Sequence, residues 1–265
     1  LLLYPAELLF TIAMKWLLLG KVQPGARPLW GMYYLRWWLF ERIIELTHVD
    51  ALAGTPLINF YYRAMGAKIG RRVHIGAHCT TAFDMIAISD DSSVGLETSM
   101  LGWTAEGGWL KFAPITIGKR CFVGARAMLR PGTAMEDDAS LGELSMLPEG
   151  ASVPRGQNWA GSPARPLTAR EDLQPHPAAG AAQTSATRRI LLALAYIAAV
   201  VILPAVYLTA LLPGIAILWT VSQHASLVAE LLRIVIVSPL VAVSFIALLA
   251  IEIVAAKWML LGRMK

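Results

Sequence analysis

A strict six-residue period in the middle of the chain limits the fold more than any other feature. Large apolar residues recur at every sixth position, at Ile117, Val123, Leu129, Met135, Leu141, Leu147, Val153 and Trp159. The fifth residue of each hexad is small or nearly so, at Cys121, Ala127, Thr133, Ala139, Ser145 and Ala151. In a triangular coil each flat face takes about one hexad, so the first residue points inward and the fifth fills a narrow corner. The period predicts a left-handed parallel β-helix over residues 68–167.

Further hexads precede the strict series. Two of them begin at Ile69 and Ile75, and two more, in a shifted phase, begin at Ile88 and Val94. Residues 80–88 break the period, and we expect this segment to bulge outward as a loop suited to binding. Residues 102–109 also leave the period, and we expect them to lie over a neighbouring unit and to wall a substrate groove.

The composition points to lipid contact at both ends of the chain. Of the 265 residues, 56% are apolar and 15% are charged, whereas soluble domains have about 45–50% apolar and about 25% charged residues. We predict a transmembrane helix over residues 1–20, truncated at its start, so the chain is expected to be a piece of a longer protein. Residues 189–265 contain two further apolar runs long enough to span a bilayer and predict a transmembrane helical hairpin. Residues 168–188 predict a flexible linker.

Residues 21–67 mix aromatic and basic residues. This pattern favours interfacial helices that lie in the headgroup layer, with a buried helix packed on the β-helix as the alternative. The net charge of +5 comes from cations beside apolar segments, including Lys15. That placement is typical of topology signals, so we expect a multi-pass protein of a bacterial-type inner membrane with a cytoplasmic β-helix, and no nucleic-acid partner.

A short motif occurs twice. Lys15-Trp16-Leu17-Leu18-Leu19-Gly20-Lys21 recurs as Lys257-Trp258-Met259-Leu260-Leu261-Gly262-Arg263. The repetition indicates that a second unit of the same kind begins at the end of the chain. Chance similarity between two membrane-exit motifs is the alternative.

Neither cysteine belongs to a metal-binding spacing. Cys79 and Cys121 each occupy the small fifth position of a hexad. We therefore interpret both as structural, and expect no disulfide and no metal site.

Three motifs resemble the hexapeptide acyltransferase family. They are Ala113-Pro114-Ile115-Thr116-Ile117-Gly118, Leu129-Arg130-Pro131-Gly132 and Gly161-Ser162-Pro163-Ala164-Arg165. The resemblance implies trimers with acyl-CoA in a groove between neighbouring β-helices, and a histidine that acts as general base.

The whole arrangement is similar to a narrower group, the membrane-embedded C-terminal part of the ε-poly-lysine synthetase family of nonribosomal peptide synthetases. The Trp-rich stretch, the His78-Cys79…Phe83-Asp84 segment and the closing Trp-Ala-Gly-Ser-Pro-Ala-Arg motif carry this likeness. It implies condensation of an aminoacyl thioester, held by phosphopantetheine on a carrier protein, with the amine of a free amino acid or a growing homopolymer. The implied partners are adenylation and carrier domains of the same enzyme, and other β-helix units as a trimer or tandem pseudo-trimer. A free-standing membrane acyltransferase that uses acyl-CoA and an inert β-helix for scaffolding or export are the alternatives.

Amide formation needs a base, because an amine is an ammonium ion at neutral pH. The candidate bases are His78, which we favour, and His74. The candidates for substrate binding are Asp84, Asp91, Glu97, Trp103 and Trp109. The alternative for each is an ordinary surface residue, a solvated carboxylate or histidine with no catalytic role.

Overall fold

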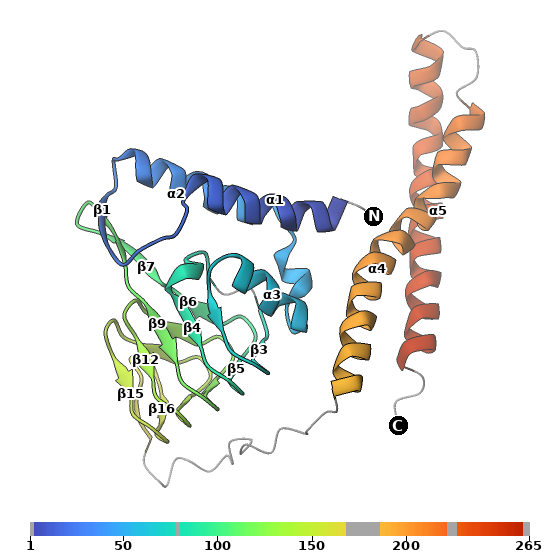
Figure 1. The fold of residues 1–265 in the computed structure, drawn as a ribbon. Coiled ribbons are helices and arrows are strands. Elements are labelled where there is room, and N and C mark those ends of the chain that lie inside the picture. Colours follow the sequence, from blue (N-terminus) through green and yellow to red (C-terminus); the bar gives the residue numbers. More distant parts are fainter. Residues whose placement is uncertain (1–2, 78–79, 168–185, 222–226, 262–265) are drawn as a thin grey trace. The chain divides into compact units, whose positions relative to one another are not determined.

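The computed structural model describes residues 3–77, 80–167, 186–221 and 227–261, which fall into two units (Figure 1). One unit runs to residue 193 and contains the hexads. The other unit comprises residues 194–265 and contains most of two long helices. We describe each unit by itself.

The hexad segment forms a three-faced parallel coil. The strands of the first face are β2 (Lys68–Ile69), β4 (Ile86–Ile88), β9 (Ile115–Ile117), β12 (Ala134–Met135) and β15 (Ser152–Val153). The second face contains β3 (His74–Ile75), β5 (Ser93–Val94), β10 (Phe122–Val123), β13 (Ser140–Leu141) and β16 (Asn158–Ala160), and it ends with the antiparallel β17 (Arg165–Pro166). The third face contains β6 (Ser99–Met100), β11 (Met128–Leu129) and β14 (Met146–Leu147). Successive hexads thus supply the three faces in turn.

The inward positions are those that the period predicted. On the first face Ile88, Ile117 and Met135 are in register and buried. Val123 and Leu129 are fully buried on the other two faces, and Trp159 at the last coil is partly buried. The period of six is therefore confirmed as the stacking pattern of the core.

The small fifth positions are buried apart from Ala151, which is partly buried, and hydroxyls at two of these corners join neighbouring coils. The hydroxyl of Ser92 donates to the carbonyl of Gly118 at 2.7 Å and accepts the N–H of Cys121 at 3.1 Å. Thr98 donates to the carbonyl of Gly124 at 3.1 Å. Hydroxyls in these corners satisfy backbone groups that the short strands leave unpaired. Cys121 is 2% exposed, as its structural interpretation requires, and Cys79 lies outside the described residues.

A helical cap closes the first coil. Helix η1 (Val49–Leu52) is followed by α3 (Pro56–Ala64). Thr55 is the N-cap of α3, and its side chain accepts the N–H of Leu57 at 3.2 Å. A proline in the first helical turn suits this start because its missing N–H would have no partner there. Ile58 and Tyr62 on α3 are fully buried in the same core cluster as the inward residues of the coil.

The loop over residues 80–88 folds inward, which corrects the expected outward bulge. It contains η2 (Phe83–Met85), where Phe83 and Met85 are buried. The ring of Phe83 packs edge-on against Tyr62, with ring centroids 5.1 Å apart. Because the apolar side chains of this segment pack against the cap, the backbone of the segment turns inward as well.

Two further helices cover this unit on the side of the cap (Figure 1). Helices α1 (Leu3–Leu18) and α2 (Met32–Glu45) contact each other, and α1 contacts α3. The insertion over residues 102–109 is a hairpin of β7 (Trp103–Glu106) and β8 (Trp109–Phe112), and β1 (Gly25–Pro28) pairs with β8 as a third strand. The hairpin therefore packs against β1 and α2 of the same chain. Its expected position over a neighbouring unit stays a prediction.

Helix α1 is not an isolated span in this structure. Its Thr11 and Lys15 are buried, and Leu8 and Ile12 pack against the core. Lys15 was expected to be a topology signal and is instead an internal residue of the folded unit.

The remaining unit contains α4 (Ala186–Val221) from residue 194 onward and α5 (Leu227–Leu261). Thr209 of α4 donates to Glu252 of α5 at 2.9 Å, and a Cβ at Gly214 would lie 2.6 Å from Val241. Small residues at such contacts let two helices approach closely. Within the described residues one segment, Val235–Trp258, is long and apolar enough to cross a membrane. The expected linker, residues 168–188, lies almost entirely outside the described residues.

Candidate functional site

Of the two candidate bases, only one can be placed. His74 lies on the outer side of β3 and is exposed, beside Gly54 of the cap. Its backbone N–H donates to the carbonyl of Ser92 at 3.0 Å, which fixes its position in the first coil. His78 lies outside the described residues and remains a prediction.

Asp84 is buried in an ion pair. Its Oδ2 atom lies 2.8 Å from Nζ of Lys15, and the two side chains are 4% and 1% exposed. The same carboxylate accepts the N–H of Val22 at 3.1 Å. Asp84 therefore fastens α1 and the chain after it to the 80–88 loop. It is not open to a substrate, contrary to its expected role.

Asp91 and Glu97 lie at corners of the coil, each in the left-handed backbone region. Asp91 accepts two hydrogen bonds from Arg72 of the preceding coil, and Glu97 accepts one at 2.6 Å from Arg126 of the next coil. The arginine in each pair holds the pKa of the carboxyl below its ordinary value. These pairs connect successive coils, and an amine substrate would have to displace an arginine from either of them.

The two tryptophans of the hairpin have different surroundings. Trp103 is partly buried, and its ring packs edge-on against Trp37 of α2 with centroids 5.8 Å apart. Trp109 is 47% exposed near the hairpin tip, in register with Pro28 of β1. The described contacts thus bring Trp103, but not Trp109, to the 80–88 loop.

A polar chain runs from Trp103 to a carboxylate that the sequence analysis missed. The indole N–H of Trp103 donates to Oγ1 of Thr81 at 3.1 Å, and the Thr81 hydroxyl donates to Glu41 of α2 at 3.3 Å. Burial raises the pKa of the Glu41 carboxyl above its ordinary value of 4.5, against the opposing effects of Thr81 and Arg42. We call Glu41, Thr81 and Trp103 the Glu41 cluster.

The Glu41 cluster lies where the chain leaves the six-residue period. Thr81 follows the predicted base His78 by three positions, and Trp103 begins the second insertion. An ionisable group with a pKa shifted by burial and held by a defined hydrogen-bond partner is typical of functional sites. In the sequence, Glu41 is a single acid directly after the aromatic stretch Trp37–Phe40. No described contact links His74 to this cluster.

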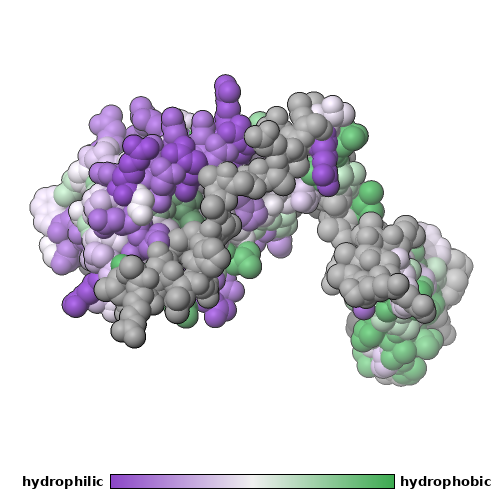
Figure 2. All heavy atoms as spheres, turned by 90° about the horizontal axis from the view of Figure 1, so that it is seen from below, coloured by the Kyte–Doolittle hydropathy of each residue, from purple (hydrophilic) through white to green (hydrophobic). Residues whose placement is uncertain are grey.

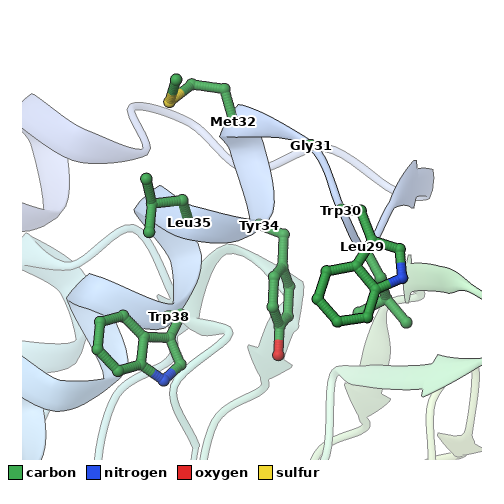
Figure 3. A pocket seen from close by; sticks show the side chains of 7 residues that line it. All are labelled: Leu29, Trp30, Gly31, Met32, Tyr34, Leu35 and Trp38. Carbon is green, nitrogen blue, oxygen red and sulfur yellow. The ribbon is translucent and has the colours of Figure 1, made fainter.

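A separate recess lies at the start of α2 (Figure 3). Its volume is about 560 Å³, and its walls are formed by Leu29, Trp30, Gly31, Met32, Tyr34, Leu35 and Trp38. None of these residues carries a charge or belongs to the Glu41 cluster. The recess therefore suits hydrocarbon better than an amino acid. Among the described residues, no group of three or more His, Cys, Asp or Glu side chains is placed to hold a metal ion.

Comparison with known proteins agrees with this architecture. The family described as the hexapeptide repeat of succinyl-transferase matches residues 114–142, which lie within the coil. Delta-poly-L-ornithine synthetase of Acinetobacter baumannii (strain AB307-0294) is 33% identical over 162 residues, or 61% of this chain. Those residues cover 12% of that synthetase, so the chain spans a small part of its relative's length.

Two solved structures show low overall similarity to this chain. A hexapeptide-repeat-containing acetyltransferase from Vibrio cholerae is 13% identical with a TM-score of 0.36, over 62% of this chain and 91% of that one. A maltose O-acetyltransferase from Clostridium difficile 630 is 12% identical with a TM-score of 0.32, over 62% of this chain and 87% of that one.

The coil, its six-residue period and the match over residues 114–142 define the central part of the chain as a hexapeptide-repeat β-helix. Beyond that repeat, the chain is similar to the ornithine polymer synthetase over 162 residues.

Proposed function

We propose that this chain is an acyl-transfer unit of a membrane-bound nonribosomal peptide synthetase that forms amide bonds between amino acids. The observation that supports it most is the 33% identity over 162 residues to a poly-L-ornithine synthetase. The acyl donor is an aminoacyl thioester on the phosphopantetheine arm of a carrier protein. The acceptor is the amine of a free basic amino acid or of the growing polymer.

The reaction needs a base and a group that holds the amine. The neutral amine attacks the thioester carbonyl, a C–N bond forms, the C–S bond breaks, and the thiol leaves. The amine arrives as an ammonium ion and must first lose a proton. A histidine side chain suits this step, because imidazole can accept a proton near neutral pH. We assign this step to His78, or to His74 if the substrate lies along β3.

Glu41 is the carboxylate that we assign to the acceptor ammonium. Asp84, Asp91 and Glu97 are each paired with a cation of the chain, whereas Glu41 receives a neutral hydroxyl from Thr81. A carboxylate in a partly buried site attracts an ammonium ion strongly, because low-dielectric surroundings strengthen the interaction. Thr81 and Trp103 fix the carboxylate in place.

The partners in this proposal are a carrier protein with its adenylation domain, and other β-helix units that form a trimer or a tandem pseudo-trimer. The setting is a bacterial inner membrane with the β-helix on the cytoplasmic side. The span Val235–Trp258 supports membrane attachment, and the basic Arg188–Arg189 pair before the α4 apolar run supports this orientation.

The test uses the purified chain in detergent with two donors, ornithinyl-pantetheine thioester and acetyl-CoA, and L-ornithine as acceptor. We expect ornithinyl-ornithine by mass spectrometry and no N-acetyl-ornithine. The reverse result would favour the acyl-CoA acyltransferase. If the folded chain forms no amide from either donor, the result would favour a β-helix that acts only as a scaffold.

Variants then test the residues. We expect Glu41→Gln to raise KM for the acceptor at least tenfold, with Glu45→Gln, an exposed acid one turn further along α2, as the matched control. We expect His78→Ala to lower kcat by about 10²-fold or more, as the loss of a general base does. Unchanged turnover in His78→Ala and His74→Ala together would exclude the assigned base.

A further inference from the structure

Helices α1 and α2 are apolar on the side that faces the domain and also on the side that faces away from it. On α1, Leu8 and Ile12 pack inward, while Leu9 and Leu17 are 68% and 77% exposed. A surface helix of a soluble domain is normally polar on its outer side. We define the outer apolar face by its six large exposed residues, which are Leu9, Phe10, Leu17, Met32, Leu35 and Trp38.

The outer side of α2 has the same character. Trp37, Phe40 and Ile44 are buried against the domain, while Met32, Leu35 and Trp38 are 66%, 54% and 46% exposed. The recess in Figure 3 opens among these exposed side chains and has the same apolar lining.

The β-helix differs from this layer. In the described residues between 68 and 167, the large apolar residues that are exposed are Leu96, Trp109, Met128 and Leu144. Seen from the side away from α1 and α2, the β-helix shows mostly hydrophilic residues (Figure 2). The apolar surface is thus concentrated on one side of the unit.

We propose that the outer apolar face docks on the surface of a lipid bilayer, with α1 and α2 lying along the headgroup layer. Contiguous apolar patches of this kind on a folded unit mark contact with a partner or a membrane. Trp16, Trp30 and Trp38 are 45%, 96% and 46% exposed, and tryptophan prefers the boundary between headgroups and hydrocarbon.

Charge and tethering favour lipid over a protein partner. Lys21, Arg27 and Arg36 are exposed around this layer, as suits attraction to anionic headgroups. The same chain contains the candidate span Val235–Trp258, which is unburied within the structure and would hold the chain at a bilayer. Docking would place the Glu41 cluster, on the inner side of α2, close to the membrane plane.

The experiment places single fluorophores on the full chain in vesicles that contain anionic lipid. In a Cys79→Ala, Cys121→Ala background, one cysteine is introduced by Leu35→Cys or Leu17→Cys on the outer apolar face. Leu144→Cys is the matched control, because Leu144 is a leucine of similar exposure (69%) at a β-helix corner. Val243→Cys, 63% exposed within the candidate span, reports insertion.

We expect nitroxide-labelled lipids to quench the probes at positions 35, 17 and 243 at least threefold more than the probe at 144. Aqueous iodide should quench in the opposite order. Equal iodide quenching at 35, 17 and 144 would overturn the proposal. Disulfide cross-linking between two Leu35→Cys copies without lipid quenching would also overturn it, and would assign the face to a second copy of the chain. The test contains no turnover measurement, so its result does not depend on the proposed reaction.

Discussion

Lys15 and Asp84, which are 69 positions apart in the sequence, form a buried ion pair with 2.8 Å between Nζ and Oδ2. The pair joins α1 to the loop after the first coil, and Asp84 also receives the N–H of Val22. Trp16 next to it donates its indole N–H to the carbonyl of Ala64 at 2.8 Å. The motif that recurs at Lys257-Trp258 is therefore, in its first copy, a docking element for a β-helix unit.

Asp84→Asn should destabilise the unit by about 3–5 kcal/mol, because a buried charge is left without its partner. Lys15→Met should cost a similar amount, and the double variant should cost less than the sum of the two. The measurement is a double-mutant cycle of denaturant unfolding on the full chain in detergent. Asp91→Asn is the control, since its pair with Arg72 is exposed and screened by salt. Additive effects of Lys15→Met and Asp84→Asn would show that the two side chains do not interact.

The sequence was sufficient to predict the β-helix, because every sixth residue must point inward and few side chains fit the corners. Even the phase shift to Ile88 and Val94 was readable, and both are buried. The segments against which the two insertions pack could not be predicted from the sequence. The hairpin over 103–112 pairs with β1, about 80 residues earlier, and no local pattern encodes that contact.

The candidate site shows the same limit. Position in or near the repeats makes several carboxylates candidates for substrate binding, but Asp91 and Glu97 are paired with arginines one coil away. Lys15 looked like a topology signal because its partner is distant in sequence. Glu41 lies in an aromatic stretch typical of a membrane-facing helix, and its surroundings depend on contacts with Thr81 and Trp103 that are distant in sequence.

Glu41 should make the folded unit less stable as the pH rises. Its native pKa is raised by burial, so the folded state binds the proton more tightly than the unfolded state does. Stability is therefore lost as the pH rises from the ordinary value of 4.5 through the raised native pKa. Glu41→Gln should match the wild type at about pH 4 and be more stable at about pH 7, by up to about 1 kcal/mol.

Thermal unfolding of the full chain across this pH range is the measurement, and Glu45→Gln, an exposed residue, is the control. A Glu41→Gln variant that is less stable than wild type at neutral pH would mean that the ionised carboxylate is structural. A gain in stability with a loss of acceptor binding would mark it as a functional group.

Glycine in the second position of a hexad should be required where coils stack closely. A Cβ at Gly95 would lie 2.7 Å from the backbone nitrogen of Ala125. A Cβ at Gly76 would lie 3.1 Å from backbone atoms of the next coil. A Cβ at Gly31 would come no closer than 3.4 Å to any neighbour, the carbonyl oxygen of Pro28. Gly95→Ala should therefore cost about 1–3 kcal/mol, as overpacking does. Gly76→Ala should cost less, and Gly31→Ala, outside the coil, should change stability by under about 1 kcal/mol. Denaturant midpoints of the three variants give the ranking, and an equal effect at all three positions would contradict it.

Cys121 should be unreactive while the β-helix is folded. Burial raises the pKa of its thiol to about 11, and the residue is 2% exposed in the corner of a coil. Only the thiolate reacts with maleimides, so both its scarcity and its burial slow the reaction. In a Cys79→Ala variant, we expect no labelling at about pH 8 in the native protein within hours, and full labelling in denaturant. Ala125→Cys supplies the control in the native protein, because position 125 lies at a corner of the same coil and is more accessible than position 121. This variant should label within minutes. Rapid native labelling of Cys121 would mean that the coil opens there, and that this thiol is not merely a small residue filling a corner.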